Sequence, residues 1–113
     1  MKLRLIVGLL FGLSAAMSMS SVSAAVDEEG AKALAKSSDC LKCHAVDKDK
    51  KGPSYKKVAA KYKGKADGED KVTKFVTSGP KVKVDGGKEE DHKVVDSKDP
   101  KQIKNLVQWI LAQ

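Results

Sequence analysis

Three side chains that can hold a haem group stand within five residues of one another. Cys40 and Cys43 are separated by two residues, and His44 follows directly. The Cys-x-x-Cys-His spacing is typical of covalent haem attachment, in which both thiols bond the porphyrin and the adjacent imidazole ligates the iron. We therefore predict one haem c per chain, attached through Cys40 and Cys43, with His44 as an axial iron ligand.

The second axial ligand is the unusual feature of this sequence. Methionine often takes that position and raises the reduction potential, but all three methionines lie in the first nineteen residues. The other histidine of the chain is His92, and a neutral imidazole can bind iron. We predict that His92 is the distal iron ligand and that an imidazole in place of a thioether lowers the reduction potential.

Two alternatives to this distal ligand stay open. His92 lies in the charged run 89–93 (EEDHK), which is also the pattern of a solvated surface segment. A lysine would then be the next candidate ligand, or the iron would keep water or an open position that binds gases. The lysines near His92 in the sequence are Lys81, Lys83, Lys88 and Lys93.

The first 25 residues have the organisation of a secretory signal peptide. Lys2 and Arg4 precede the apolar stretch 5–17, and small residues follow. A retained membrane anchor is the weaker alternative, because this stretch is shorter than the roughly 20 residues that span a bilayer. We predict cleavage after residue 24 or 25, export to the periplasm, and a mature domain of residues 26–113 that has no methionine and no stable membrane insertion.

Charge narrows the classes of partner. The chain carries a formal charge of +7, and loss of Lys2 and Arg4 would leave lysine as its one basic residue type apart from histidine. Because arginine favours bidentate contacts with phosphates and bases, we expect no nucleic-acid binding. A lysine cluster beside the haem motif favours redox protein partners with acidic surfaces, although solubility alone would also explain it. The cluster consists of Lys42, Lys48, Lys50 and Lys51.

The apolar pattern predicts an all-α domain of about four helices. We expect helices over residues 27–36, 54–62 and 69–77, and a last helix that begins after residue 99. Residues 79–98 have no helical period, and valines that alternate with lysines before a Gly-Gly turn favour a short hairpin there. The predicted mature domain has few large apolar side chains, so a haem would supply much of its core.

These residues together resemble the small monohaem class I cytochromes c of the bacterial periplasm. The resemblance rests on residues 40–44 (CLKCH), on Gly52-Pro53, on residues 55–59 (YKKVA) and on residues 109–111 (WIL). It implies four helices around one covalent haem, with the first and last helices crossing. It also implies that the Pro53 carbonyl accepts a hydrogen bond from His44 and so orients the proximal ring.

Other chemistries fit the same residues less well. A zinc site of both cysteines and both histidines is disfavoured, because adjacent Cys43 and His44 are awkward ligands for one tetrahedral metal. A Cys40–Cys43 disulfide would close too small a loop to stabilise the chain, and a thioredoxin-like dithiol needs a βαβ pattern that is missing here. We see no catalytic triad or paired catalytic carboxylates, so we expect no enzyme.

We therefore predict a monomeric periplasmic carrier of single electrons. One alternative is a haem-based ligand-binding or sensor protein with an open or displaceable distal site. Another is a cytochrome subunit of a periplasmic oxidoreductase complex. Carbon monoxide would separate the carrier from the sensor, because iron with two protein ligands resists it.

Overall fold

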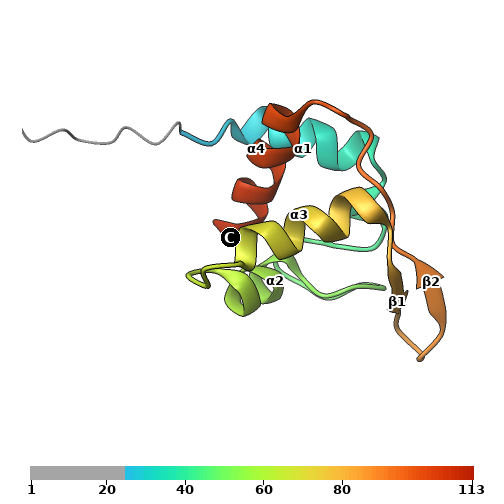
Figure 1. Cartoon of the computed structure of the whole chain (residues 1–113). Helices are drawn as coiled ribbons and strands as arrows, with labels where there is room; N and C mark the ends of the chain where they lie inside the picture. Colours follow the sequence, from blue (N-terminus) through green and yellow to red (C-terminus); the bar gives the residue numbers. More distant parts are fainter. Residues whose placement is uncertain (1–24) are drawn as a thin grey trace, which may run out of the picture.

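The computed structural model of the protein describes residues 25–113, so the predicted signal peptide lies outside the described residues. Four α-helices and one antiparallel hairpin make up this part of the chain (Figure 1). In chain order the elements are α1 (Glu28–Ser37), the 3₁₀ turn η1 (Cys40–Lys42), α2 (Tyr55–Tyr62), α3 (Gly68–Ser78), β1 (Lys81–Lys83), β2 (Glu89–Asp91) and α4 (Pro100–Leu111). The predicted helices are confirmed to within one or two residues at each end.

Three of the helices begin at a residue whose side chain caps the first turn. Asp27 accepts a hydrogen bond from the Gly30 N–H, Ser54 accepts one from Lys57, and Asp99 accepts one from Lys101. Such caps satisfy backbone donors that have no partner inside the helix. The local sequence therefore marks where α1, α2 and α4 begin, and Asn105 of α4 also holds the backbone of Asp27 at the start of α1.

The first and last helices pack across one another at the top of the view in Figure 1, as the resemblance implied. Ala31 and Ala35 of α1 are fully buried, and they pack in one cluster with Leu106 and Trp109 of α4. Their small side chains let the two helices approach closely. The packed helices α1 and α4 thereby form one side of the domain, and α2 and α3 pack against α4.

The helices α2 and α3 complete the framework, and α4 contacts both of them. A second, smaller cluster joins Val72 and Val76 of α3 to Val107 of α4. These valines are too small to fill the interior that the four helices surround. The described chain therefore encloses a cavity instead of closing its core.

The short hairpin expected between α3 and α4 is present. Its strands pair Lys81 with Asp91 and Lys83 with Glu89, so the second strand is acidic. Opposite charges across a strand pair stabilise it, and the Lys81 ammonium lies 2.8 Å from the Asp91 carboxylate.

Within residues 25–113, no helix is long and apolar enough to cross a membrane.

Candidate functional site

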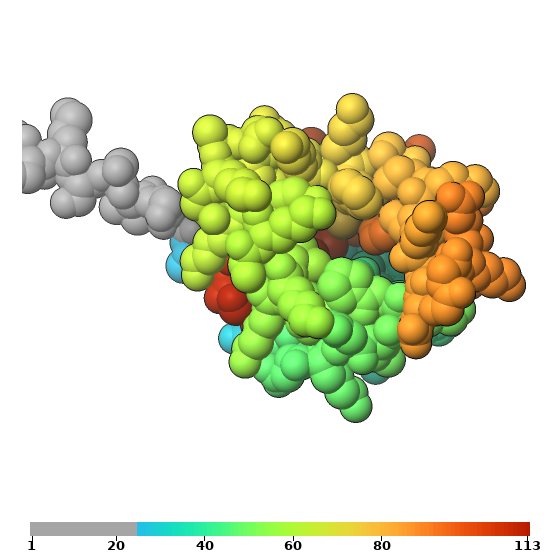
Figure 2. All heavy atoms as spheres, turned by 90° about the horizontal axis from the view of Figure 1, so that it is seen from below, coloured from blue at the N-terminus to red at the C-terminus, as the bar shows by residue number. Residues whose placement is uncertain are grey.

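A deep cavity of about 420 Å³ opens between α2, α3 and the hairpin. Seen from below, the molecule is hollowed there, and α4 is visible at the floor of the hollow (Figure 2). Ligand pockets usually measure about 300–1,000 Å³ and are mainly apolar, so this cavity has the size and character of a cofactor site. Its apolar walls include Val58, Val72, Phe75, Val76 and Ile110.

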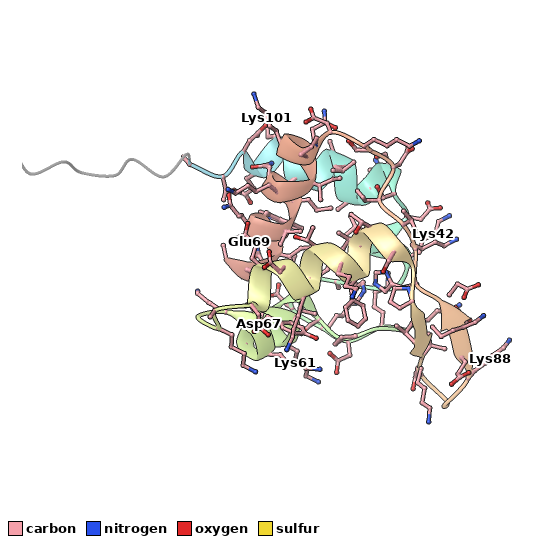
Figure 3. The ribbon with its side chains drawn as sticks, in the orientation of Figure 1. Lys42, Lys61, Asp67, Glu69, Lys88 and Lys101 are labelled. Atoms are coloured by element: carbon pink, nitrogen blue, oxygen red, sulfur yellow. The ribbon has the colours of Figure 1, made fainter. Side chains whose placement is uncertain are left out.

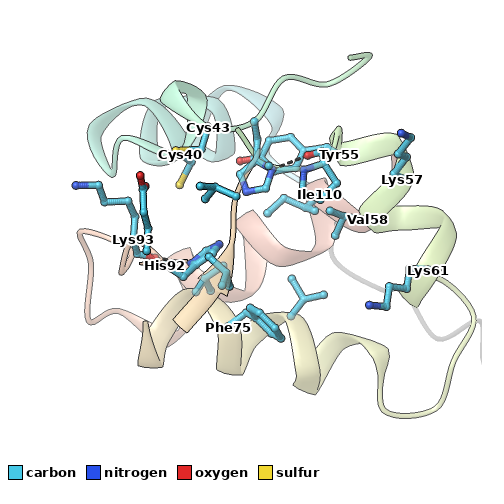
Figure 4. A pocket seen from close by; sticks show the side chains of 18 of the residues that line it. Cys40, Cys43, Tyr55, Lys57, Val58, Lys61, Phe75, His92, Lys93 and Ile110 are labelled. Atoms are coloured by element: carbon cyan, nitrogen blue, oxygen red, sulfur yellow. Dashed lines mark hydrogen bonds between the residues drawn. The ribbon is translucent and has the colours of Figure 1, made fainter. Parts of the chain in front are cut away.

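Cys40 and Cys43 line one end of this cavity (Figure 4), and His44 also lines it. The turn η1 brings them there, because the His44 N–H donates to the Cys40 carbonyl over 3.0 Å. Asp39 precedes the turn in the left-handed region at φ 60°, a conformation that aspartate tolerates better than most residues. Burial raises the pKa of the Cys40 thiol, so this side chain is a neutral thiol at pH 7.

The His44 imidazole is held in place by contacts on three sides. The Pro53 carbonyl oxygen lies 2.6 Å from Nδ1 of His44, which donates to it as expected. The Tyr55 ring stacks on the imidazole at 5.1 Å between ring centres and an interplanar angle of 19°. Gly52 lies directly against the ring, since a Cβ added there would be 2.7 Å from the Cε1 atom of His44. The geometry leaves Nε2 as the nitrogen that can bind a metal.

The electrostatics of His44 suit a metal ligand. Burial lowers the pKa of this imidazole, the Pro53 hydrogen bond raises it in part, and the nearby His92 lowers it again. The net lowering favours the neutral ring at pH 7. Only a neutral imidazole has a lone pair free to bind iron.

The second histidine enters the cavity from the opposite wall. His92 follows strand β2, and its N–H donates to the Pro80 carbonyl over 2.9 Å. Its Nδ1 donates to the Lys93 carbonyl over 2.8 Å, which turns Nε2 away from that carbonyl. The Phe75 ring packs edge-on against it at 5.9 Å between centres. His92 is thus half-buried in the cavity wall.

The two imidazoles face one another, with 6.1 Å between ring centres and an interplanar angle of 48°. The competing lysine ligands are less well placed as a group, because only Lys83 and Lys93 of the four line the cavity. Within residues 25–113, no three His, Cys, Asp or Glu side chains are arranged to hold a metal ion. The alternative zinc site therefore has no ligand set in this geometry.

A family model for cytochrome c matches residues 28–113, which is nearly the whole described chain. The chain belongs to the cytochrome c family. Cytochrome c-551 of Pseudomonas denitrificans is 33% identical over 79 residues, which cover 70% of this chain and 92% of that protein. Cytochrome c-551 of Pseudomonas aeruginosa is 39% identical to this chain over 51 residues, which cover 45% of this chain and 49% of that protein.

Solved structures agree on the fold. The class 1 cytochrome MtoD from Sideroxydans lithotrophicus ES-1 superposes with a TM-score of 0.74 at 58% identity, over 78% of this chain and 97% of that one. Wild-type cytochrome c552 of Nitrosomonas europaea superposes with a TM-score of 0.56 at 28% identity, over 72% and 96%. The predicted class I cytochrome c fold is therefore confirmed.

Family membership settles the cofactor and the kind of activity. Proteins of this family carry covalently bound haem c, one per chain in the small class I members, and they transfer electrons without being enzymes. This cytochrome is accordingly a haem-containing electron carrier that has redox partners.

Sequence reasoning missed three residues that shape the site. Gly52 and Tyr55 enter the sequence analysis only as parts of the family pattern, and the apolar pattern gives Phe75 no special place. Phe75 is 39% exposed, which is unusual for a core position and is explained by the cavity that it faces. A sequence signal existed for Gly52 alone, because a glycine beside the predicted carbonyl acceptor often marks a close approach of the backbone.

Gly52→Ala should displace the His44 ring, because the added Cβ has no room beside Cε1. We expect a weaker Pro53 hydrogen bond, a shifted low-spin spectrum of the haem protein and a loss of stability of about 1–3 kcal/mol. Electron paramagnetic resonance and thermal unfolding measure the two effects. Pro53→Ala is the matched control, since it keeps the carbonyl oxygen, and equal spectra for both variants would contradict the steric role of Gly52.

Proposed function

We propose that this cytochrome is a monomeric periplasmic electron carrier whose iron is held by His44 and His92. The distance between the two rings supports this best. Two trans metal–imidazole bonds of about 2.0 Å, with about 1.1 Å from each nitrogen to its ring centre, require about 6 Å between ring centres. The observed 6.1 Å matches that spacing.

The rest of the cavity suits the group that the family carries. A haem supplies a one-electron couple between ferric and ferrous iron. The apolar walls exclude water from the space between the histidines, while the open side of the cavity leaves room for one edge to face solvent. The chain's own contribution is to hold the two imidazoles in place in both oxidation states, which keeps the structural change on electron transfer small.

Cys40 and Cys43 are proposed to attach the haem by adding each S–H across a vinyl group. Both thiols are free of any disulfide, and both line the cavity that His44 also lines.

Acidified acetone should precipitate the protein with its haem still attached. Thioether bonds survive this treatment, whereas a haem held only by iron ligands is extracted. The Cys40→Ala and Cys43→Ala variants each keep one bond, and the double variant should release haem into the solvent. Haem in the solvent from the wild-type protein, or zinc in place of iron by elemental analysis, would contradict the attachment.

Bis-histidine ligation has a consequence for the reduction potential. An imidazole donates electrons to ferric iron better than a thioether does, and so it stabilises the oxidised state. Axial ligands control a range of roughly 0.8 V. We therefore propose that the potential is lower than that of a relative with a methionine ligand, and that the carrier serves a low-potential chain.

Replacement of His92 tests the ligand and the function together. His92→Ala should open the iron to carbon monoxide and to added imidazole, and it should abolish the low-spin spectrum in the absence of such ligands. His92→Met should raise the potential by part of the roughly 0.8 V range, if the sulfur reaches the iron. Optical spectra with and without carbon monoxide, and a redox titration, measure these effects.

A matched control is available in the same loop. Val94 is 52% exposed and lies two residues beyond His92, so Val94→Ala changes the loop without removing an imidazole. We expect this variant to keep the wild-type spectrum. If His92→Ala also keeps it, and if the wild-type protein binds carbon monoxide readily, the carrier assignment gives way to an open-site sensor.

We propose the periplasmic location from the sequence of the first 25 residues. Residues 1–25 are proposed to be a cleaved signal peptide, and residues 26–113 are proposed to be the periplasmic cytochrome domain. Mass spectrometry of the protein from a periplasmic extract would show the first residue after cleavage. Light scattering of the same sample would show whether it is a monomer.

The proposed encounter with acidic partners rests on the lysines near the haem motif. Three of the four have local partners: Lys42 pairs with Asp39 at 3.1 Å, Lys51 pairs with Glu90 at 3.3 Å, and the Lys50 ammonium donates to a backbone carbonyl. The positive charges of Lys42 and Lys51 are therefore partly offset by a neighbouring carboxylate. Lysines also cover other faces of the molecule, as Lys88 and Lys101 do (Figure 3).

The rate of electron transfer to an acidic partner should fall several-fold as salt rises. The screening length shrinks from about 30 Å at 0.01 M to about 8 Å at 0.15 M, which weakens steering. Lys48→Gln with Lys50→Gln should flatten this dependence more than Lys42→Gln, because Lys42 is already paired. Lys104→Gln on α4 is the distant control, and a rate that does not depend on salt would contradict an acidic partner.

A further inference from the structure

Two lysines line the end of the cavity that lies away from the cysteines. Lys57 and Lys61 both belong to α2, and their spacing of four residues puts them on the same face of that helix. In the close-up view they stand at one end of the cavity, and Cys40 and Cys43 stand at the other (Figure 4). Cations at the end of a mainly apolar cavity indicate that an anionic group belongs there.

The chemistry of the haem supplies that anion. In the porphyrin of haem c, the two carbons that bond cysteine sulfur and the two propionates lie on opposite halves of the ring. If Cys40 and Cys43 fix the first half at their end of the cavity, the propionates point toward the end where α2 lies. This step rests on the proposed attachment, and it does not depend on which side chain is the distal ligand.

The two lysines differ in how free they are to bind a carboxylate. Lys57 already pairs with Asp49. Lys61 has no acidic partner within residues 25–113, and its ammonium lies 5.3 Å from the centre of the Tyr62 ring. We propose that Lys61 forms an ion pair with a haem propionate and that Lys57, shared with Asp49, adds a weaker second contact.

The other charged groups around the cavity are less suited to this role. Lys93 lies at the cysteine end (Figure 4), Asp39 directly precedes Cys40 in the chain, and Lys83 belongs to strand β1. Glu90 and Asp91 carry the wrong sign and are paired with Lys51 and Lys81. On α3 and α4, the side chains that face the cavity are apolar. Lys61 is therefore the cation on which the propionate end depends.

This ion pair would connect the reduction potential to pH. An ammonium group beside a propionate keeps that carboxyl ionised and lowers its pKa, and the carboxylate charge in turn offsets the ferric iron. When Lys61 is removed, the propionate should take up a proton at a higher pH. The pH range in which the potential changes should then move upward.

The test is a redox titration of the holoprotein from pH 5 to pH 9. Lys61→Gln should raise the pKa of the redox-linked transition by up to about one unit, the low end of the shift expected from a neighbouring opposite charge. Infrared difference spectra with haem labelled at its carboxyl carbons should show the propionate bands change in the same variant. Lys61→Arg keeps the charge and should restore both readouts.

Lys63→Gln is the matched control, because it removes an equal charge two residues away, on an exposed side chain that does not line the cavity. The proposal is overturned if Lys61→Gln leaves the pH profile and the propionate bands as they are in the control. A change in thermal stability alone would mean that Lys61 only packs on Tyr62. An unaltered low-spin spectrum in all variants would show that the axial ligands, and with them the proposed function, are unaffected.

Discussion

The helices and the hairpin surround one apolar cavity, and two imidazoles line it. His44 and His92 reach this position from opposite walls of the cavity, with 6.1 Å between their ring centres. Each ring uses its Nδ1 for a backbone carbonyl, that of Pro53 or of Lys93. Such hydrogen bonds fix the orientation of a ligand before the metal arrives. Other features of the fold serve to hold these two rings apart.

The four helices can surround a cavity because the contacts that join them lie outside it. Fully buried alanines bring α1 and α4 together, and a small valine cluster joins α3 to α4. The cavity is then lined by apolar side chains, of which Phe75 is still 39% exposed. Without the haem, this apolar surface would face water, which is unfavourable. The cofactor is thus a part of the core, and we expect the stability of the domain to depend on it.

The wall that carries His92 is a loop, and backbone contacts as well as the buried Val95 hold it in place. Gly79 ends α3 at φ +62°, and a Cβ there would lie 3.0 Å from the His92 carbonyl. The charged hairpin follows, and the Val95 N–H then returns to the Val76 carbonyl over 2.8 Å. A histidine within a charged run therefore lies in a wall of the cavity, because the charges pair across the strands while the next residue turns inward.

Local signals in the sequence determined much of this protein. Apolar periodicity predicted the four helices, and the spacing of Cys40, Cys43 and His44 predicted the cofactor, because both patterns extend over only a few residues. Only the tertiary structure showed that the centre of the His92 ring lies 6.1 Å from that of the His44 ring, although 48 residues separate them in the chain. It also showed that Tyr55 stacks on the His44 ring and that the acidic residues 89–91 form the second strand. The physical reason is that these pairings depend on how separate elements pack, and no local periodicity records that packing.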